Sequence, residues 1–360
     1  MKQIFGISFG ETHSCIATLD RYGNPTVIYN VEDAKHNLNN AVFFEDTGSI
    51  LVGDAALDML TVDSERVVLS PKSELRKPDA STYLFDGITY TPTEICSLII
   101  KRLKMMGLEQ GYDVSDVVLA IPAYYGMEEK VASINMCKLA QLNVVGFIEE
   151  PTAAAWSFYH NGLDKDEILL VFDLGGGSFD ASVLRVLANE DNDNREASIK
   201  IIAISGNELL GGKAWDNKLF DYVLEHYCEE NAVLADEISI DTWQIIRNKV
   251  MRAKNKLSIA ESATLMINTG GVNTCITVTR EEFEALTSDL VLQTMASVDE
   301  VLQSAGIENI DRVLLVGGAC RMPMIYKAIE SRFPGKVFLE DPEMAIAKGA
   351  AIYGGLLQQI

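Results

Sequence analysis

Histidine is scarce in this chain, and closely spaced cysteine pairs are absent. The four histidines are dispersed among 360 residues, an arrangement that offers no cluster typical of a zinc site. The six cysteines form no Cys-x-x-Cys pair and lie mostly in apolar surroundings. We therefore expect reduced core thiols and a cytoplasmic protein.

Positive charge and long apolar runs are also in short supply. The 30 Lys and Arg residues face 52 Asp and Glu residues, which leaves a formal net charge of −22. That excess argues against a general binder of nucleic acids or acidic membranes, although N–H donors, lysine and metal can still bind phosphate locally. No apolar run is long enough to span a bilayer, and polar residues interrupt the N-terminus where a signal peptide requires an apolar stretch.

The length of the chain predicts two lobes, because 360 residues are too many for one ordinary core. Hairpin strands followed by alternating helices and strands indicate an α/β fold in which helices pack on mixed sheets. We expect a first lobe over residues 1–165 and a second over 166–340. A C-terminal helix within 341–360 is expected to pack back on the first lobe.

A glycine-rich turn between two predicted strands, 168–172 and 179–186, is the most informative stretch. Glycine lets a ligand approach the backbone closely, and successive N–H groups in such a turn can bind an anion. Asp173 and Asp180 flank the turn, which favours a hard cation such as Mg²⁺, held mainly through its waters. A tight turn without a ligand is the alternative. The turn consists of Gly175, Gly176, Gly177 and Ser178.

The N-terminal segment 4–19 repeats this pattern of strand, polar turn and strand. Aligning the two turns places Gly10 opposite Gly175 and Ser8 opposite Asp173. A repeat over this distance predicts two similar halves whose hairpins face one cleft. Two opposed hairpins can hold a polyphosphate from both sides, but the first copy has a serine where the second has an acid.

Three further positions are weaker candidates for phosphate binding. Lys72 follows a predicted strand and a proline, although a solvated lysine is the commoner case. Glu150 lies where a strand leads into a helix, a usual place for site residues, but the helix dipole alone can explain a carboxylate there. The glycine pair 317–318 follows a buried strand and by itself is weak evidence for a phosphate or ribose site.

Capping residues predict where several helices begin. Thr91-Pro-Thr-Glu94 combines an N-cap, a first-turn proline and an acidic third position, and predicts a helix that ends at Gly107. Thr279-Arg-Glu-Glu282 is a capping box and predicts one long helix to about residue 305. Further helices are predicted to begin after an N-cap at Asp241, and at Ala153, Pro323 and Pro342.

Five segments in fixed order carry a family resemblance. They are Glu150-Pro-Thr-Ala-Ala-Ala155, Phe172-Asp-Leu-Gly-Gly-Gly-Ser-Phe-Asp180, Leu210-Gly-Gly-Lys-Ala-Trp-Asp216, Leu315-Val-Gly-Gly-Ala-Cys-Arg-Met-Pro323 and Ala347-Lys-Gly-Ala-Ala351. They resemble the nucleotide-binding domain of the 70-kDa heat-shock chaperones, within the actin and sugar-kinase superfamily. The resemblance covers essentially the whole chain and implies a two-lobed, actin-like (ribonuclease H-like) ATPase fold with ATP in a central cleft.

The resemblance also implies roles for individual residues. Asp173 and Asp180 match acids that hold metal-bound water, Glu150 and Lys72 match residues beside the attacking water, and Ser178 matches a threonine beside the γ-phosphate. The implied phosphate hairpins contain Gly10, Glu11, Thr12, Gly175, Gly176 and Gly177. The implied nucleoside side contains Gly211, Gly212, Lys254, Ser258, Gly317, Gly318, Arg321 and Glu343, the last in place of the usual Asp.

The first hairpin departs from the family pattern, which reads Asp-Leu-Gly-Thr-Thr where this chain has Ser8-Phe-Gly-Glu-Thr12. One carboxylate on the metal side is missing. Glu11 places a negative charge where a hydroxyl normally meets phosphate, which should weaken ATP binding or slow turnover unless Glu11 takes over the metal role. Asn255 also replaces an arginine that often stacks on adenine.

The resemblance implies slow Mg²⁺-dependent hydrolysis of ATP to ADP by a chaperone domain. The alternatives are a nucleotide-binding interaction module with little catalysis and, with less support from the motifs, a sugar kinase. The implied partners are the nucleotide, co-chaperones or a nucleotide-exchange factor, and unfolded clients bound through a substrate domain that these 360 residues do not include. Neither nucleic acid nor membrane is expected as a partner.

Overall fold

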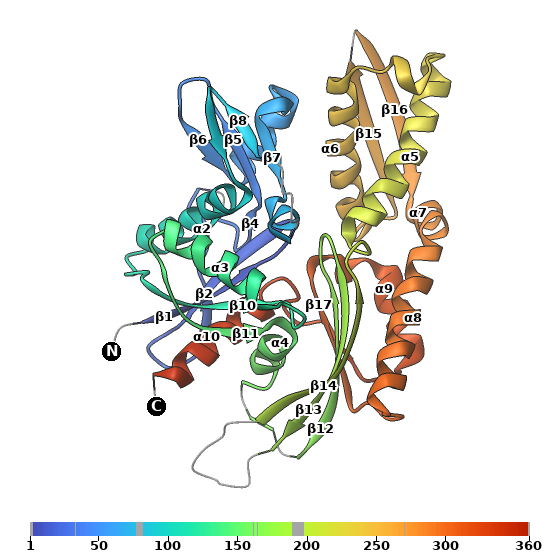
Figure 1. Ribbon diagram of the computed structural model, residues 1–360. Helices are drawn as coiled ribbons and strands as arrows, with labels where there is room; N and C mark the ends of the chain where they lie inside the picture. Colours follow the sequence, from blue (N-terminus) through green and yellow to red (C-terminus); the bar gives the residue numbers. More distant parts are fainter. Residues whose placement is uncertain are drawn as a thin grey trace.

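A computed structural model describes residues 3–32, 34–76, 82–160, 162–163, 165–188, 198–269 and 271–358. Two lobes lie side by side, with the elements from β1 to α4 in one and those from β12 to β18 in the other (Figure 1). The predicted two-lobed α/β fold is therefore confirmed. No helix in the described ranges combines the length and apolar composition that crossing a membrane requires.

Each lobe contains a five-stranded path of the same topology. In both, three antiparallel strands continue into two parallel ones, so the order β3-β2-β1-β10-β11 repeats as β14-β13-β12-β17-β18. This repeat is the duplication that the two glycine turns predicted. The bounds are β1 Ile4–Phe9, β2 His13–Leu19, β3 Pro25–Val27, β10 Asp116–Ile121, β11 Asn143–Glu149, β12 Glu167–Leu174, β13 Phe179–Leu187, β14 Ser198–Asn207, β17 Arg312–Val316 and β18 Val337–Phe338. The short strand β4 (Leu38–Asn39) pairs with β2 beside this path.

Smaller sheets and helices extend both lobes on the same side of the molecule (Figure 1). In the first lobe β5, β6 and β7 form one sheet and β8 and β9 another, whereas in the second lobe β15 and β16 lie beside α5 and α6. The bounds are β5 Ala41–Phe44, β6 Ile50–Val52, α1 Asp54–Asp58, β7 Val67–Leu69, η3 Pro71–Arg76, β8 Tyr83–Phe85, β9 Ile88–Tyr90, α5 Gly212–Asn231, α6 Ile240–Leu257, β15 Ser262–Thr269 and β16 Val272–Thr279. Short 3₁₀ turns lie at Met59–Thr61 (η1), Ser64–Arg66 (η2), Ala235–Glu237 (η4) and Gly318–Arg321 (η5).

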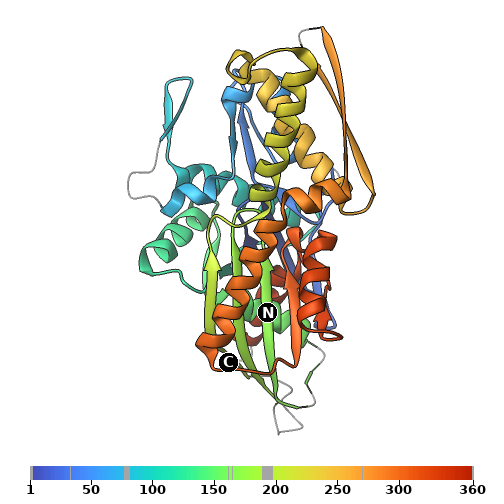
Figure 2. The ribbon, with the colours of Figure 1, turned by 90° about the vertical axis from the view of Figure 1, so that its right-hand side faces the viewer.

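Most of the remaining helices cover the faces of the two large sheets, whereas α7 packs against β16, α5 and α8. Figure 2 shows α8 and α9 in front of the second sheet, and α2 with α3 lies on the first. The bounds are α2 Pro92–Glu109, α3 Met127–Leu139, α4 Glu150–Phe158, α7 Arg280–Leu286, α8 Ser288–Ala305, α9 Pro323–Arg332 and α10 Ala345–Leu357.

The apolar run of strand β12 is continuous because the strand is buried on both faces of its sheet. Leu170 and Phe172 belong to the core beneath α8 and α9, whereas Leu169 and Val171 belong to a core shared with α4 and α10. A strand buried on both faces needs apolar residues at successive positions rather than at alternate ones. The second of these cores contains residues of both lobes, so it joins them.

Helices α4 and α10 cross in very close contact within this shared core. A Cβ atom at Gly349 of α10 would lie 1.7 Å from the carbonyl oxygen of Ala153 in α4. Gly6 of β1 is equally restricted, because its Cβ would lie 2.2 Å from the backbone nitrogen of Ala351. The small residues of the last helix thus fix α10 against both α4 and the first sheet.

Several predicted helix starts are confirmed. Thr91 and Thr279 each accept a hydrogen bond from the backbone N–H three residues on, and the glutamate there bonds back. Helix α9 begins at Pro323 as predicted. Gly107, however, does not end α2, which continues to Glu109. Its Cβ would lie 2.4 Å from Cγ2 of Val114, so this glycine serves close packing rather than helix termination.

Four other helix predictions are wrong at their boundaries. Ser239, not Asp241, caps α6 by accepting a hydrogen bond from the Thr242 N–H at 3.3 Å. The predicted long helix after Thr279 is two helices that meet at Thr287, whose hydroxyl donates to the Phe283 carbonyl at 2.8 Å. Side-chain bonds of this kind compete with regular helix geometry.

The other two corrections concern helix starts beside the shared core. Helix α4 begins at Glu150 rather than Ala153, with Pro151 in its first turn. Helix α10 begins at Ala345 rather than Pro342, and the Pro342 carbonyl instead accepts the Gly317 N–H at 2.7 Å. Tertiary contacts, not local capping, decide both positions.

The crossing of α4 and α10 predicts unequal effects of two alanine substitutions in one helix. Gly349→Ala should lower the free energy of unfolding by roughly 3 kcal/mol or more, because it forces two backbones apart. Gly355→Ala should cost little or even stabilise α10, since its Cβ meets only the flexible end of Leu19 at 2.5 Å and alanine favours helix by about 1 kcal/mol. Urea unfolding of both variants measures the difference, and equal effects would contradict the close crossing.

Candidate functional site

The two glycine turns are closed by the same hydrogen bond. The Gly10 N–H donates to the His13 carbonyl at 3.0 Å, and the Gly175 N–H donates to the Ser178 carbonyl at 3.0 Å. This equivalence supports the alignment of the turns made from the sequence. The turns therefore have related backbones, whatever side chains they carry.

The strands that lead into these turns differ in charge. Asp173 and Asp180 are direct register partners in the second hairpin, and the corresponding partners in the first are Ser8 and Cys15. The two positions that carry acids in the second hairpin are thus occupied by neutral residues in the first. The paired strand positions therefore offer carboxylates to a cation only in the second hairpin.

A third turn, at the start of α5, packs directly on the second hairpin. The Gly212 N–H donates to the Gly175 carbonyl at 2.9 Å, and the Lys213 N–H donates to the Gly176 carbonyl at 2.8 Å. A Cβ atom at Gly211 would lie 2.3 Å from the carbonyl carbon of Gly177. Glycine is required at this contact because backbone meets backbone.

The first hairpin closes over the same turn from the other lobe. A Cβ atom at Gly176 would lie 2.1 Å from the Thr12 hydroxyl, and one at Gly177 would lie 2.5 Å from Cγ of Glu11. The predicted phosphate-hairpin residues are therefore brought together, and side chains of the first turn lie on the glycines of the second.

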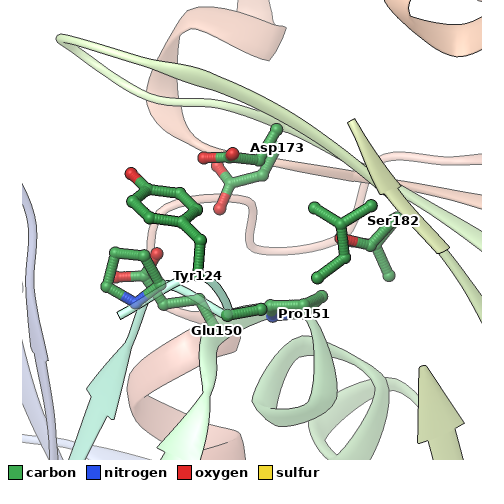
Figure 3. A pocket seen from close by; sticks show the side chains of 10 residues that line it. Tyr124, Glu150, Pro151, Asp173 and Ser182 are labelled. Atoms are coloured by element: carbon green, nitrogen blue, oxygen red, sulfur yellow. The ribbon is translucent and has the colours of Figure 1, made fainter. Parts of the chain in front are cut away.

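Three carboxylates meet at one end of these turns. Glu150 is the first residue of α4, Asp173 lies near the end of β12, and Asp180 lies near the start of β13. All three line a cavity of about 10 Å³, the space of about one water molecule, together with Tyr124 and Ser182 (Figure 3). The remaining lining residues are Pro122, Ala123, Pro151, Val171 and Ile204.

Burial raises the pKa of Asp173 well above its usual range, and the charges of Glu150 and Asp180 raise it further. Lys72 acts in the opposite direction, but does not cancel these effects. Room for the Asp180 carboxylate comes from Gly206 on β14, where a Cβ would lie 2.5 Å from Oδ1 of Asp180. The arrangement has an excess of negative charge in a poorly hydrated place.

Lys72 is the cation of this group. It follows Ser70, whose φ of 52° turns the chain after β7, and Pro71. Its Nζ donates to the Phe9 carbonyl at 2.5 Å and lies 3.6 Å from Oε1 of Glu150. Burial opposes its charge, but neighbouring acidic groups, Glu150 among them, still raise the pKa of Lys72, so this side chain is positively charged at neutral pH.

The predicted nucleoside-side residues lie at the other end of the turns. Lys254 of α6 is buried and donates to the Gly212 carbonyl at 2.9 Å and to Oδ2 of Asp216 at 2.7 Å. The other oxygen of Asp216, Oδ1, is buried and has no hydrogen-bond partner among the residues that the structure describes. Ser258 makes a local contact, since its hydroxyl donates to the Lys254 carbonyl at 3.5 Å.

Arg321 and Glu343 form a two-bond pair on this side. Nε of Arg321 donates to Oε1 of Glu343 at 3.0 Å, and Nη2 donates to Oε2 at 3.4 Å. Gly318 lies beneath this pair, where a Cβ would approach Oε1 of Glu343 to 3.4 Å. Gly317 has a φ of 85°, and a Cβ atom there would lie 2.2 Å from the carbonyl oxygen of Leu174. This turn therefore contacts the end of β12.

The sequence did not single out several residues that the fold adds to these groups. Tyr124 and Ser182 line the carboxylate cavity, Asp216 binds Lys254, and Lys213 forms an ion pair with Glu11. Tyr124 follows the carboxyl end of a parallel strand, a position that favours site residues. Lys213 and Asp216 lie within a quoted family motif, but nothing in the motif indicates their partners.

Direct metal coordination is not indicated within the described ranges. No group of three or more His, Cys, Asp or Glu residues there has the geometry of a metal site. The buried excess of carboxylate charge at Asp173 nevertheless fits a divalent cation that is held through its waters rather than by direct ligands.

A comparison with known families gives one finding. The family model described as Hsp70 protein matches residues 77–359. The match includes Glu150, both acids of the second hairpin and the α5 turn, whereas the first hairpin and Lys72 lie before it.

The raised pKa of Asp173 predicts a pH-dependent gain in stability for Asp173→Asn in EDTA. A carboxyl whose pKa is higher in the folded chain than its unfolded value of about 3.9 destabilises the fold as pH rises above that value. Asparagine cannot ionise and avoids this loss. The variant should therefore melt at least about 2 °C higher than the wild type at pH 7, with the difference vanishing towards pH 4.

Asp221→Asn provides the matched control, because Asp221 is exposed on α5. Its melting temperature should follow that of the wild type from pH 4 to pH 8. A lower stability of Asp173→Asn at pH 7 would mean that Lys72 stabilises the ionised carboxylate more than burial opposes it.

Proposed function

Because the chain belongs to the Hsp70 family and carries a chaperone-type ATPase domain, we propose that its central site hydrolyses ATP slowly to ADP and phosphate in a Mg²⁺-dependent reaction. One observation carries this proposal. Glu150, Asp173 and Asp180 surround a water-sized cavity at one end of three converging glycine turns. Phosphoryl transfer to water needs positioning and charge neutralisation more than covalent chemistry.

The proposed roles follow from the contacts of each side chain. Glu150 lines the water-sized cavity and is the residue placed to orient the attacking water and accept its proton. Lys72, positively charged and 3.6 Å from Glu150, would stabilise negative charge that develops on the terminal phosphate. Ser178 lies in the glycine turn and would donate its hydroxyl to the same phosphate.

Asp173 and Asp180 are the residues proposed to hold Mg²⁺, through its waters. Bound there, the ion would neutralise phosphate charge and relieve the repulsion among the carboxylates. The raised pKa of Asp173 supports this role, because a carboxylate that is costly to ionise alone is favourable beside a cation.

The rest of the nucleotide is proposed to lie along the glycine turns. Gly10, Thr12 and the glycines of the second hairpin would contact the phosphates, and Lys254, Arg321 and Glu343 would bind the nucleoside. Asp216 has a buried oxygen without a partner, and a ribose hydroxyl could donate to it. Co-chaperones, an exchange factor and unfolded clients remain the proposed protein partners.

A single-turnover assay with labelled ATP tests the proposal. The wild type should release phosphate with Mg²⁺ and not with EDTA. Lys72→Ala and Asp173→Asn should each slow the reaction by about 100-fold or more, since each removes an electrostatic contribution to the transition state. Asp221→Asn is again the control and should keep the wild-type rate. An unchanged rate in Asp173→Asn would refute this site.

A nucleotide-binding interaction module with little catalysis is the second candidate. Ser8 and Cys15 support it, because they leave the paired strand positions of the first hairpin without carboxylates. Glu11, in the turn of that hairpin, adds negative charge beside the phosphate turns. The same assay separates the two functions. Tight binding of ATP without cleavage would favour the module, whereas release of phosphate would favour the ATPase.

A further inference from the structure

An ion pair joins the two lobes across the glycine turns. Oε1 of Glu11, in the turn between β1 and β2, lies 3.0 Å from Nζ of Lys213, in the first turn of α5. In Figure 1 these elements are dark blue and yellow, and they belong to different lobes. The Glu11 side chain is 15% exposed and that of Lys213 is 46% exposed, so the pair reaches from a covered position towards solvent.

The pair lies directly over the proposed phosphate cradle. Glu11 rests on Gly177, with 2.5 Å between its Cγ and a Cβ built on that glycine. Lys213 is fixed from the other side, because its backbone N–H donates to the Gly176 carbonyl at 2.8 Å. Both charges therefore belong to the walls of one site, although 202 residues separate them in the chain.

The two charges favour opposite outcomes when a phosphate group arrives. Lysine forms strong charge-assisted hydrogen bonds with phosphate, whereas a carboxylate repels it. Half-exposed ion pairs contribute little to stability, so Lys213 can leave Glu11 at small cost when a more highly charged anion competes for it. Glu11 also contributes to the raised pKa of Lys72, so its negative charge acts on the cation beside Glu150 as well as on Lys213.

We propose that Glu11 and Lys213 form an exchangeable latch that sets nucleotide specificity. This inference rests on the proposed nucleotide site. Lys213 is a phosphate-binding residue that a bound nucleotide takes from Glu11, and the released Glu11 carboxylate opposes the terminal phosphate. Glu11 therefore lowers the affinity for ATP more than that for ADP.

Substituting either partner of the ion pair distinguishes the proposed latch from an ion pair that only stabilises the fold. Glu11→Gln and Lys213→Met both remove the ion pair. Without nucleotide, both variants should lose a similar, small amount of thermal stability. With nucleotide, the latch predicts opposite shifts, because one variant removes repulsion and the other removes an attraction.

The experiment is calorimetric titration of ATP and ADP, with Mg²⁺, into the 360-residue protein and each variant. Glu11→Gln should bind ATP roughly tenfold more tightly and ADP only a few-fold more tightly. Lys213→Met should bind both nucleotides roughly tenfold more weakly. These shifts should shrink at high salt, because the pair and the cradle are partly exposed.

Asp58→Asn is the matched control, since Asp58 and Arg252 form another pair between the lobes at 3.4 Å, exposed and made by α1 and α6. It should leave both affinities unchanged. Shifts of the same direction in Glu11→Gln and Lys213→Met, or none, would overturn the latch. A wild type that binds neither nucleotide would instead overturn the proposed function, and the latch with it.

Discussion

The site depends on three carboxylates that the fold holds together against their mutual repulsion. Asp173 and Asp180 are register partners in one hairpin, and Glu150 reaches the same cavity from the first turn of α4. Helix α4 is itself held by α10, which crosses it where Gly349 leaves no room for a side chain. The carboxylates cannot separate without disturbing the core that joins the lobes. The excess negative charge must be offset by a proton, by Lys72 or by a cation, and this requirement supports the proposed role of the cavity in phosphate chemistry.

The duplication of the sheet supplies the geometry but not the charge. Each half repeats a hairpin that is closed by one equivalent hydrogen bond, and side chains of the first turn pack on the glycines of the second. The second hairpin carries acids at its paired strand positions, Asp173 and Asp180, whereas Ser8 and Cys15 occupy the matching positions of the first. In the proposed function, two similar backbones with different side chains have different roles: the second hairpin holds a cation, and Glu11 of the first opposes the terminal phosphate.

Local chemistry made part of this structure predictable. The capping boxes at Thr91 and Thr279 and the strands around the glycine turn follow from side chains near in sequence, and they lie where the sequence predicted them. The prediction that Gly107 ends a helix is wrong, because glycine is needed there to make room for the Val114 side chain. That contact crosses a loop and has no local sequence signal. The carboxylates were identified from a motif and a repeat, but their shared cavity, with Tyr124 opposite, depends on the packing of both lobes and has no local signature.

The pairing of Glu11 with Lys213 could not have been predicted for the same reason. From the sequence, Glu11 only adds repulsion to a phosphate turn, whereas the fold places a lysine of the other lobe within 3.0 Å of it. The formal charge contributed by this pair is zero, but its two halves belong to different lobes. Lys213 therefore neutralises Glu11 across the contact between the lobes. The proposed competition of a phosphate for Lys213 would remove this neutralisation. In the proposed latch, phosphate binding and this contact between the lobes are coupled through Lys213, and thermodynamic linkage makes such a coupling reciprocal.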